Sequence, residues 1–191
     1  MAKLEVVTAP TSEPVTIAEL KDHLAVTDGE FDSYIQHIGQ AAREWVEDTT
    51  WRSLITQTWD QSFDRFETVM RLRNPPVSSI TSVKYTDTSG TQNTVTSSVY
   101  ELGEWDGVST VRLQYQQTWP ASVRGHADDV VVRYIAGYGA STAVPEVFKH
   151  AIKLLVGEMF EHRENVITGT IVARIGTLEN LLRPYRVRFN V

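Results

Sequence analysis

The spacing of apolar residues changes twice along this sequence, and these two changes constrain the fold more than any other feature. Between residues 16 and 50, apolar side chains recur every three or four positions, as they do on one face of a helix. From about 54 to 136, β-branched and aromatic residues occur in short runs divided by turn-forming residues, which is typical of strands. Helical spacing returns at Pro145. We therefore predict an α+β fold in which a discontinuous helical domain, about four helices from both chain ends, carries an inserted small antiparallel β domain.

Two capping signals mark the first helices. Thr16 is followed three residues later by Glu19, which is the pattern of a capping box and predicts a short helix over 17–25. Thr27 and Glu30 repeat the pattern and predict the start of a second, longer helix.

The remaining helices lie near the other end of the chain. Pro145 suits the first turn of a helix, and the apolar spacing continues to about Arg163. A last short helix is expected over 177–183, where Pro184 stops it. Each apolar stripe is too narrow to enclose a core alone, so the two helical segments are expected to pack together.

This reasoning divides the chain into three parts. The helical domain comprises 1–52 and 142–183, and the inserted β domain comprises 53–141. Within the β domain, the turn-forming run at 87–93 predicts a hairpin. Residues 184–191 form a separate C-terminal arm.

The arm has the spacing of a strand, although the element before it is a helix. After Pro184 the sequence reads YRVRFNV, in which large apolar residues alternate with polar ones. One interpretation is a final strand of the chain's own β domain. The other is an arm that docks on a partner subunit by strand addition, with its arginines against an acidic surface.

Charge is distributed unevenly along the chain. The net charge is −6, which argues against a general nucleic-acid binder because phosphate contacts need clustered Lys and Arg. The first 50 residues hold ten acidic and three basic side chains, whereas residues 183–191 hold three arginines and no acid. There is no apolar run long enough to span a membrane and no secretory signal, so we expect a protein made and used in a cytoplasm.

One helix carries residue types that enzymes use. The chain has no cysteine, so a metal would need His and carboxylate ligands. His150 and His162 are twelve residues apart, about 18 Å along a helix, and cannot bind one metal ion. Glu158 and His162 are spaced i, i+4 and are predicted to form a structural ion pair, while a small hydrolase or metal enzyme built on that pair is the enzymatic alternative. We expect no catalytic residue, no metal and no cofactor.

The order of motifs resembles a known family. The motifs are VTIAELKDHLAV, AAREWVEDTTWRSLITQTWDQSF, NPPVSSITSVKYTDTSG, WPASV, VVVRYIAGYG, VPEVFKHAIKLLVGEMFEHRE and LLRPYR, and together they extend from about residue 8 to 186. In this order they resemble the head-tail connector (adaptor) proteins of tailed bacteriophages, in particular the group with a β insertion in the helical connector fold.

This resemblance implies a non-enzymatic virion protein of the neck, assembled in the host cytoplasm. Such proteins form a homo-oligomeric ring, usually of twelve copies, beneath the portal protein, and the opposite side of the ring receives a stopper or tail-completion protein. Double-stranded DNA passes through the channel without sequence-specific binding, and no membrane is involved. A head-completion (stopper) or tail-terminator protein is the alternative within the same particle.

The resemblance also indicates which residues meet the portal. The family's C-terminal segment typically reaches the portal, and this chain continues five residues beyond the familiar PYR ending. The expected portal-docking arm consists of Leu181, Leu182, Arg183, Pro184, Tyr185, Arg186, Val187, Arg188 and Phe189.

Overall fold

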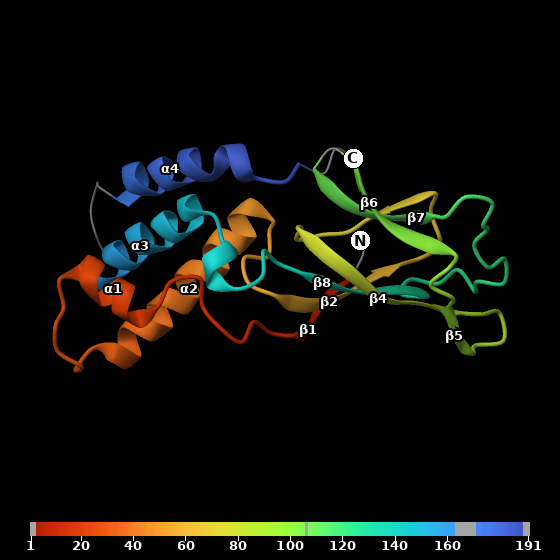
Figure 1. Ribbon diagram of the computed structural model, residues 1–191, viewed down its shortest axis with the longest axis horizontal. Coiled ribbons are helices and arrows are strands. Elements are labelled where there is room, and N and C mark those ends of the chain that lie inside the picture. The colour runs from red at the N-terminus through yellow and green to blue at the C-terminus, as the bar shows by residue number, and fades with distance from the viewer. Residues whose placement is uncertain (1–2, 106, 163–170, 189–191) are drawn as a thin grey trace. The chain divides into compact units, whose positions relative to one another are not determined.

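The computed structural model describes residues 3–105, 107–162 and 171–188, with the backbone alone for 171–175. These residues divide into two units, shown in Figure 1. The β unit contains residues 3–10 and 56–137, and the helical unit contains residues 11–55 and 138–188. The fold is therefore α+β with a β domain inserted between two helical segments, as the spacing of apolar residues predicts.

The predicted start of the first helix is confirmed. In α1 (Ile17–Leu24), the backbone N–H of Glu19 donates to the Thr16 hydroxyl at 3.2 Å, and the Thr16 N–H donates to the Glu19 carboxylate at 2.8 Å. This reciprocal pair is a capping box. It satisfies backbone donors that the first helical turn leaves without partners.

The second predicted capping box is wrong. Helix α2 (Asp32–Thr50) begins after Phe31, which makes no side-chain cap. The Glu30 N–H donates instead to the Asp28 carboxylate at 3.1 Å. Asp28 thus builds a local turn that competes with a helix starting at Thr27.

The last two helices lie close to where they are predicted, except at the start of α4. Helix α3 (Glu146–Glu161) begins directly after Pro145. Helix α4 (Ile171–Leu182) ends before Pro184 as expected but starts six residues earlier than predicted. Its first turns contain β-branched residues and Gly176, whose low helix propensity hides the helix in the sequence.

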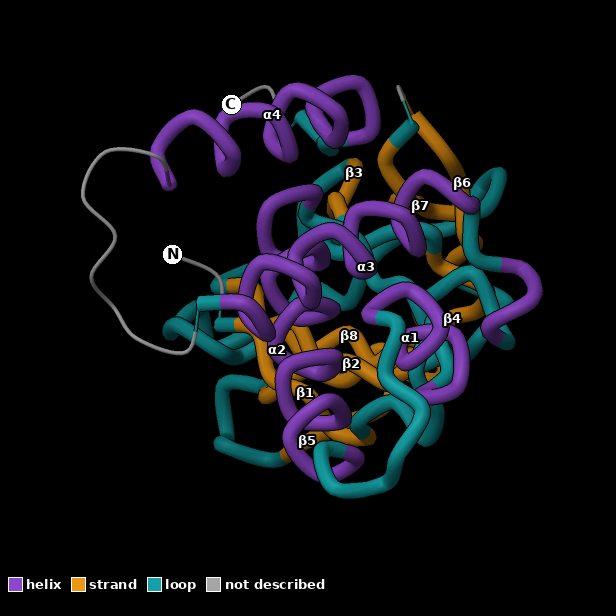
Figure 2. Tube along the Cα trace, turned by 90° about the vertical axis from the view of Figure 1, so that its left-hand side faces the viewer, coloured by secondary structure: helices purple, strands orange, loops and turns teal. Residues whose placement is uncertain are grey.

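Helices α2 and α3 form the centre of the helical unit, because each packs against the other three helices, and α3 carries much of the core (Figures 1 and 2). Its apolar face carries Phe148, Ala151, Ile152, Leu155 and Val156, all buried. A short 3₁₀ turn, η1 (Ser141–Ala143), leads into it. No helix among the described residues is both long and apolar enough to cross a bilayer.

The β unit contains two antiparallel sheets that share one core. The larger sheet has the order β1-β2-β8-β4-β5, and the smaller has the order β3-β7-β6. Their strands are β1 (Leu4–Thr8), β2 (Gln57–Phe63), β3 (Val69–Arg71), β4 (Val77–Thr86), β5 (Gln92–Val95), β6 (Tyr100–Trp105), β7 (Val108–Leu113) and β8 (Val130–Ala136). The central strand β8 buries every second residue, namely Val130, Val132, Tyr134 and Ala136.

Residues 3–10, which the hydrophobic pattern places with the helices, belong instead to the β unit. Strand β1 pairs antiparallel with β2 along its length, with Leu4 opposite Gln61. As an edge strand it exposes most of its side chains, so its sequence lacks the alternation that marks a half-buried strand.

The predicted hairpin at 87–93 is confirmed between β4 and β5. The Asp87 carboxylate accepts hydrogen bonds from Ser89, Thr91 and Asn93 across the turn. Gly90 has φ of 86°, which a side chain there would strain.

Candidate docking surface at the end of the helical unit

The C-terminal segment turns sharply at Pro184. Pro184 has no N–H to continue the helix, and the chain closes a 3₁₀ turn, η2 (Arg183–Tyr185). The Arg186 N–H donates to the Arg183 carbonyl at 3.4 Å, and residues 186–188 continue without strand pairing. The predicted strand over 185–191 is thus absent from 185–188, while residues 189–191, including Phe189, lie outside the described residues.

This turn is fixed to the end of α2 by backbone contacts. The Val187 N–H donates to the Thr50 carbonyl at 3.0 Å, and Val187 is 6 % exposed. The Arg52 Nε donates to the Tyr185 carbonyl at 2.7 Å. Leu182, just before the turn, is fully buried. Two of the nine residues predicted to dock on a portal, Leu182 and Val187, therefore anchor the segment to its own chain.

Two aromatic contacts complete the anchoring. The Tyr185 ring meets the Phe148 ring edge-on, with centroids 5.4 Å apart. The Arg186 guanidinium lies 5.8 Å from the centroid of the Trp51 ring, within the range of a cation–π interaction. Trp51 ends α2 in the left-handed conformation with φ of 57°.

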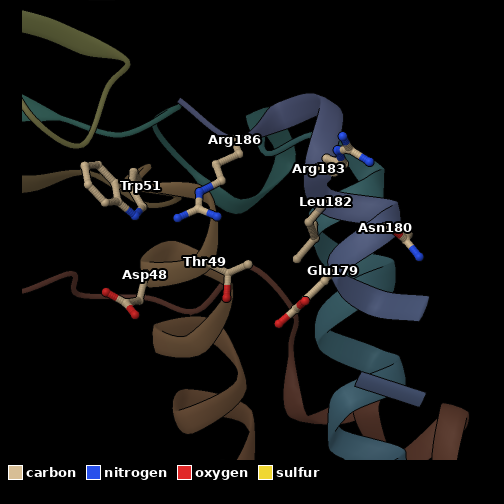
Figure 3. Close-up of a pocket in the computed structure, with 8 residues that line it drawn as sticks. All are labelled: Asp48, Thr49, Trp51, Glu179, Asn180, Leu182, Arg183 and Arg186. Atoms are coloured by element: carbon tan, nitrogen blue, oxygen red, sulfur yellow. The ribbon is translucent and has the colours of Figure 1, made fainter. Parts of the chain in front are cut away.

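An open pocket of about 410 Å³ lies between the ends of α2 and α4. In Figure 3, Glu179 and Leu182 point from α4 toward α2, while Arg183 points away from α2. The lining residues are Asp48, Thr49, Trp51, Glu179, Asn180, Leu182, Arg183 and Arg186. The formal charges of the two carboxylates and two guanidinium groups in this lining sum to zero. Among the residues described, however, no ion pair joins them.

We call Arg183, Arg186 and Arg188 the basic corner. All three are exposed, and none of them forms an ion pair within the part of the chain that the structure describes. Because the backbone between them is anchored, the corner presents its charge from a fixed position. Guanidinium groups held in this way favour bidentate contact with carboxylates.

A buried ion network stabilises the C-terminal end of α2, the end to which the C-terminal segment is hydrogen-bonded. Arg43 is 5 % exposed and contacts Glu47 at 2.6 Å and Glu13 at 2.8 Å. The second Glu47 oxygen accepts the Leu54 N–H at 2.7 Å. Burial raises the pKa of Glu47, although the hydrogen bond from the Leu54 N–H and the charge of Arg43 act to lower it. The network ties residues 13, 43–47 and 54 together and so fixes the carbonyl of Thr50 between them.

The predicted ion pair between Glu158 and His162 is not formed. His162 is the C-cap residue of α3, with φ of −117°, and no ion pair joins its side chain to that of Glu158. Only its backbone N–H contacts Glu158, at the carbonyl. The Glu158 Oε1 is buried without a hydrogen-bond partner.

A metal centre receives no support from the described residues. Across residues 3–105, 107–162 and 171–188, no group of three or more His, Asp or Glu side chains is arranged to hold a metal ion. His126 and Asp129 lie in a turn in which the Asp129 carboxylate accepts the His126 N–H and pairs with Arg124.

Three solved structures share this fold. The first, a chain from the "Neck of empty GTA particle computed with C6 symmetry", aligns with a TM-score of 0.81 at 21 % identity over 99 % of this chain and 97 % of its own. The second, from the "Virion of native gene transfer agent (GTA) particle", has a TM-score of 0.79 at 21 % identity over 98 % and 97 %. The third, from the "Neck of native GTA particle computed with C12 symmetry", has a TM-score of 0.74 at 21 % identity over 99 % and 97 %.

No protein-family model and no curated protein matches the chain. At 21 % identity, the structural likeness establishes the fold alone. The alignment covers nearly the whole of both chains. These fold relatives are components of a phage-like particle, two of them described in its neck.

Proposed function

We propose that this protein is a structural, non-enzymatic component of the neck of a phage-like particle, a connector that joins the capsid to the tail. The observation that carries this proposal is the likeness, over 99 % of the chain, to a protein in the neck of a gene transfer agent particle. The order of sequence motifs supports the same role independently. In this proposal the protein resides in the neck of the virion, is assembled in the host cytoplasm, and needs no cofactor.

The proposed assembly is a closed ring of twelve copies beneath the portal. The neck structures that contain the fold relatives were computed with sixfold and twelvefold symmetry, which favours a ring in this particle as well. A stopper or tail-completion protein would meet the opposite side of the ring. The net charge of −6 suits a channel through which DNA slides, because few phosphate contacts mean weak binding.

The portal contact is proposed for the C-terminal segment, residues 181–189. Leu182 and Val187 are buried in the chain's own helical unit, so they hold the segment in place. Val187 is the last buried residue among those described, and Arg188 follows it exposed. We therefore assign the direct portal contact chiefly to Arg188 and the residues after it.

The test is binding of recombinant portal protein by the full chain and by a chain truncated after Val187. We expect the full chain to co-purify with the portal and the truncated chain to lose at least tenfold in affinity while keeping its thermal unfolding temperature. A Trp105→Ser variant is the control, because Trp105 is 67 % exposed on the β unit and lies outside the proposed contact. Equal binding by the truncated and full chains would remove the portal assignment.

A further inference from the structure

We infer that neighbouring copies contact each other head to tail, with Arg183 and Arg186 of the basic corner of one copy against the acidic residues around the connection between α1 and α2 of the next, while Arg188 faces the portal. This inference rests on the proposed ring, and it names the surfaces that close it. Among the described residues, neither surface forms an ion pair within its own chain.

The basic side of the contact is preformed. The backbone of the corner is held by the Val187 and Arg52 hydrogen bonds, so little chain entropy is lost on binding. Arg186 is held over Trp51 and shares its pocket with Asp48 and Glu179. Arg183 points away from α2, and we assign it the larger part of the contact (Figure 3).

The acidic side is a group of carboxylates near the start of α2 for which the described residues show no ion pair. We call Asp28 and Glu30, in the connection between α1 and α2, together with Asp22 in the last turn of α1, the acidic loop. All three are exposed, and in the described part of the chain none pairs with a Lys or Arg. Their neighbour Asp32, by contrast, is neutralised by Lys21 at 2.7 Å.

The two surfaces lie at opposite ends of α2. The acidic loop leads into the N-terminus of this helix and the basic corner is bonded to its C-terminus, as Figure 1 shows. A helix of 19 residues is about 27 Å long, so the two surfaces of one copy cannot meet. Two different complementary patches on one rigid unit make a heterologous interface, which closes into a ring when the rotation allows it.

The expected strength follows from the exposure of these groups. Single exposed ion pairs are weak and are screened by salt, so the contact must depend on several charges and on closure of the ring. Assembly should therefore weaken as salt rises from 0.1 to 1 M, where the screening length falls from about 10 to about 3 Å.

The test uses two charge-reversal variants with wild-type portal present. Arg183→Glu/Arg186→Glu makes both surfaces acidic, and Asp28→Lys/Glu30→Lys makes both basic. We expect each variant alone to lose the ring in native mass spectrometry, at least tenfold relative to wild type. An equimolar mixture should restore rings in which the variants alternate, because each acidic corner then meets a basic loop and each basic corner an acidic loop.

Three controls make every outcome informative. Asp64→Lys/Glu67→Lys reverses two exposed charges on the β unit and should assemble as wild type does. Thermal unfolding checks that each variant folds. Because the chain has no cysteine, Arg183→Cys/Glu30→Cys should give a ladder of disulfide-linked multimers, whereas Arg183→Cys/Glu161→Cys should give none.

The results separate the two proposals. Rings formed by each variant alone, or no rescue and no disulfide ladder with folded variants, would overturn the head-to-tail contact and leave the connector role standing. Absence of rings from wild type and from the β-unit control would contradict the ring itself, and the inference with it.

Discussion

Asp87 shows how one side chain organises a turn. Hydrogen bonds from the Ser89 hydroxyl, and then from the Thr91 N–H and Asn93, lower the pKa of Asp87 from 3.8 to about 2. Because the folded pKa lies below the unfolded one, these bonds stabilise the hairpin above about pH 4, and the contribution is lost as pH falls toward 2.

We expect a carboxyl NMR titration to give Asp87 a pKa near 2. In a Ser89→Ala variant the pKa should rise toward its usual range, because the largest cause of the shift is removed. Val95, which is buried in the adjoining strand β5, offers a control, since Val95→Thr leaves these hydrogen bonds in place. A pKa that does not respond to Ser89→Ala would contradict this account of the turn.

Arg43 is a second case at the scale of single residues. Removing one partner of a buried ion pair leaves the other buried and uncompensated, which costs about 3–5 kcal/mol. We expect Arg43→Ala to destabilise the helical unit by about this amount, measured by urea unfolding. Arg112→Ala, which breaks the exposed pair with Glu101, should cost about 0–1 kcal/mol. Similar losses in the two variants would show that the Arg43 network does not hold the end of α2.

Among single residues, the sequence predicted what depends on near neighbours. The Thr16 and Glu19 capping box forms because both groups lie within one turn of helix. The basic residues of the corner were visible as a run of arginines. The residues that anchor this segment could not be predicted from the sequence. Arg52 and Tyr185, for example, are 133 positions apart and meet only through tertiary packing. The Glu158 and His162 pair was predicted from helical spacing, but His162 follows the last helical residue of α3 and the pair is not formed.

Helices α1 and α2 cross at a glycine. A Cβ on Gly39 would lie 2.9 Å from the Leu20 Cδ1, closer than atoms pack. A Cβ on Gly157 in α3 would have only ordinary contacts, the nearest at 3.5 Å from His23. The two glycines therefore differ in packing while sharing the low helix propensity of glycine.

This difference predicts opposite effects of alanine. Gly157→Ala should be neutral or stabilise by up to about 1 kcal/mol, because alanine favours the helix. Gly39→Ala should be less stable than Gly157→Ala by about 1–3 kcal/mol, because the added methyl group overpacks the helix crossing. Thermal unfolding of both variants measures the difference, and equal stabilities would mean that the crossing has room for a side chain.

At the scale of elements, the sequence predicted those with a strong period or a strong terminal signal. The hairpin at 87–93 and the helix after Pro145 are of this kind. Strand β1 was not predicted, because this edge strand exposes most of its side chains and lacks the alternation of a half-buried strand. The helix start predicted at Thr27 is wrong for a different reason. The Asp28 carboxylate accepts the Glu30 N–H, which the Thr27 side chain would accept in a capping box.

For the whole molecule, the main property is the separation of charge along a rigid helical unit. Among the described residues, exposed carboxylates without an ion pair lie before the start of α2, and three arginines without an ion pair lie at its other end, where two of them share a pocket with Asp48 and Glu179. The apolar core explains how this unit folds, but it does not explain these exposed and unmatched charges. A head-to-tail ring does, because it brings each basic corner to an acidic loop on the next copy.

The most direct test of the connector role is an electron cryo-microscopy reconstruction of the portal protein mixed with this protein. We expect a ring of twelve copies bound directly to the portal, with the C-terminal segments against the portal and Arg183 and Arg186 of each copy beside the acidic loop of the next. Density for this protein away from the portal, as expected for a stopper or tail-terminator protein, or no ring at all, would contradict it.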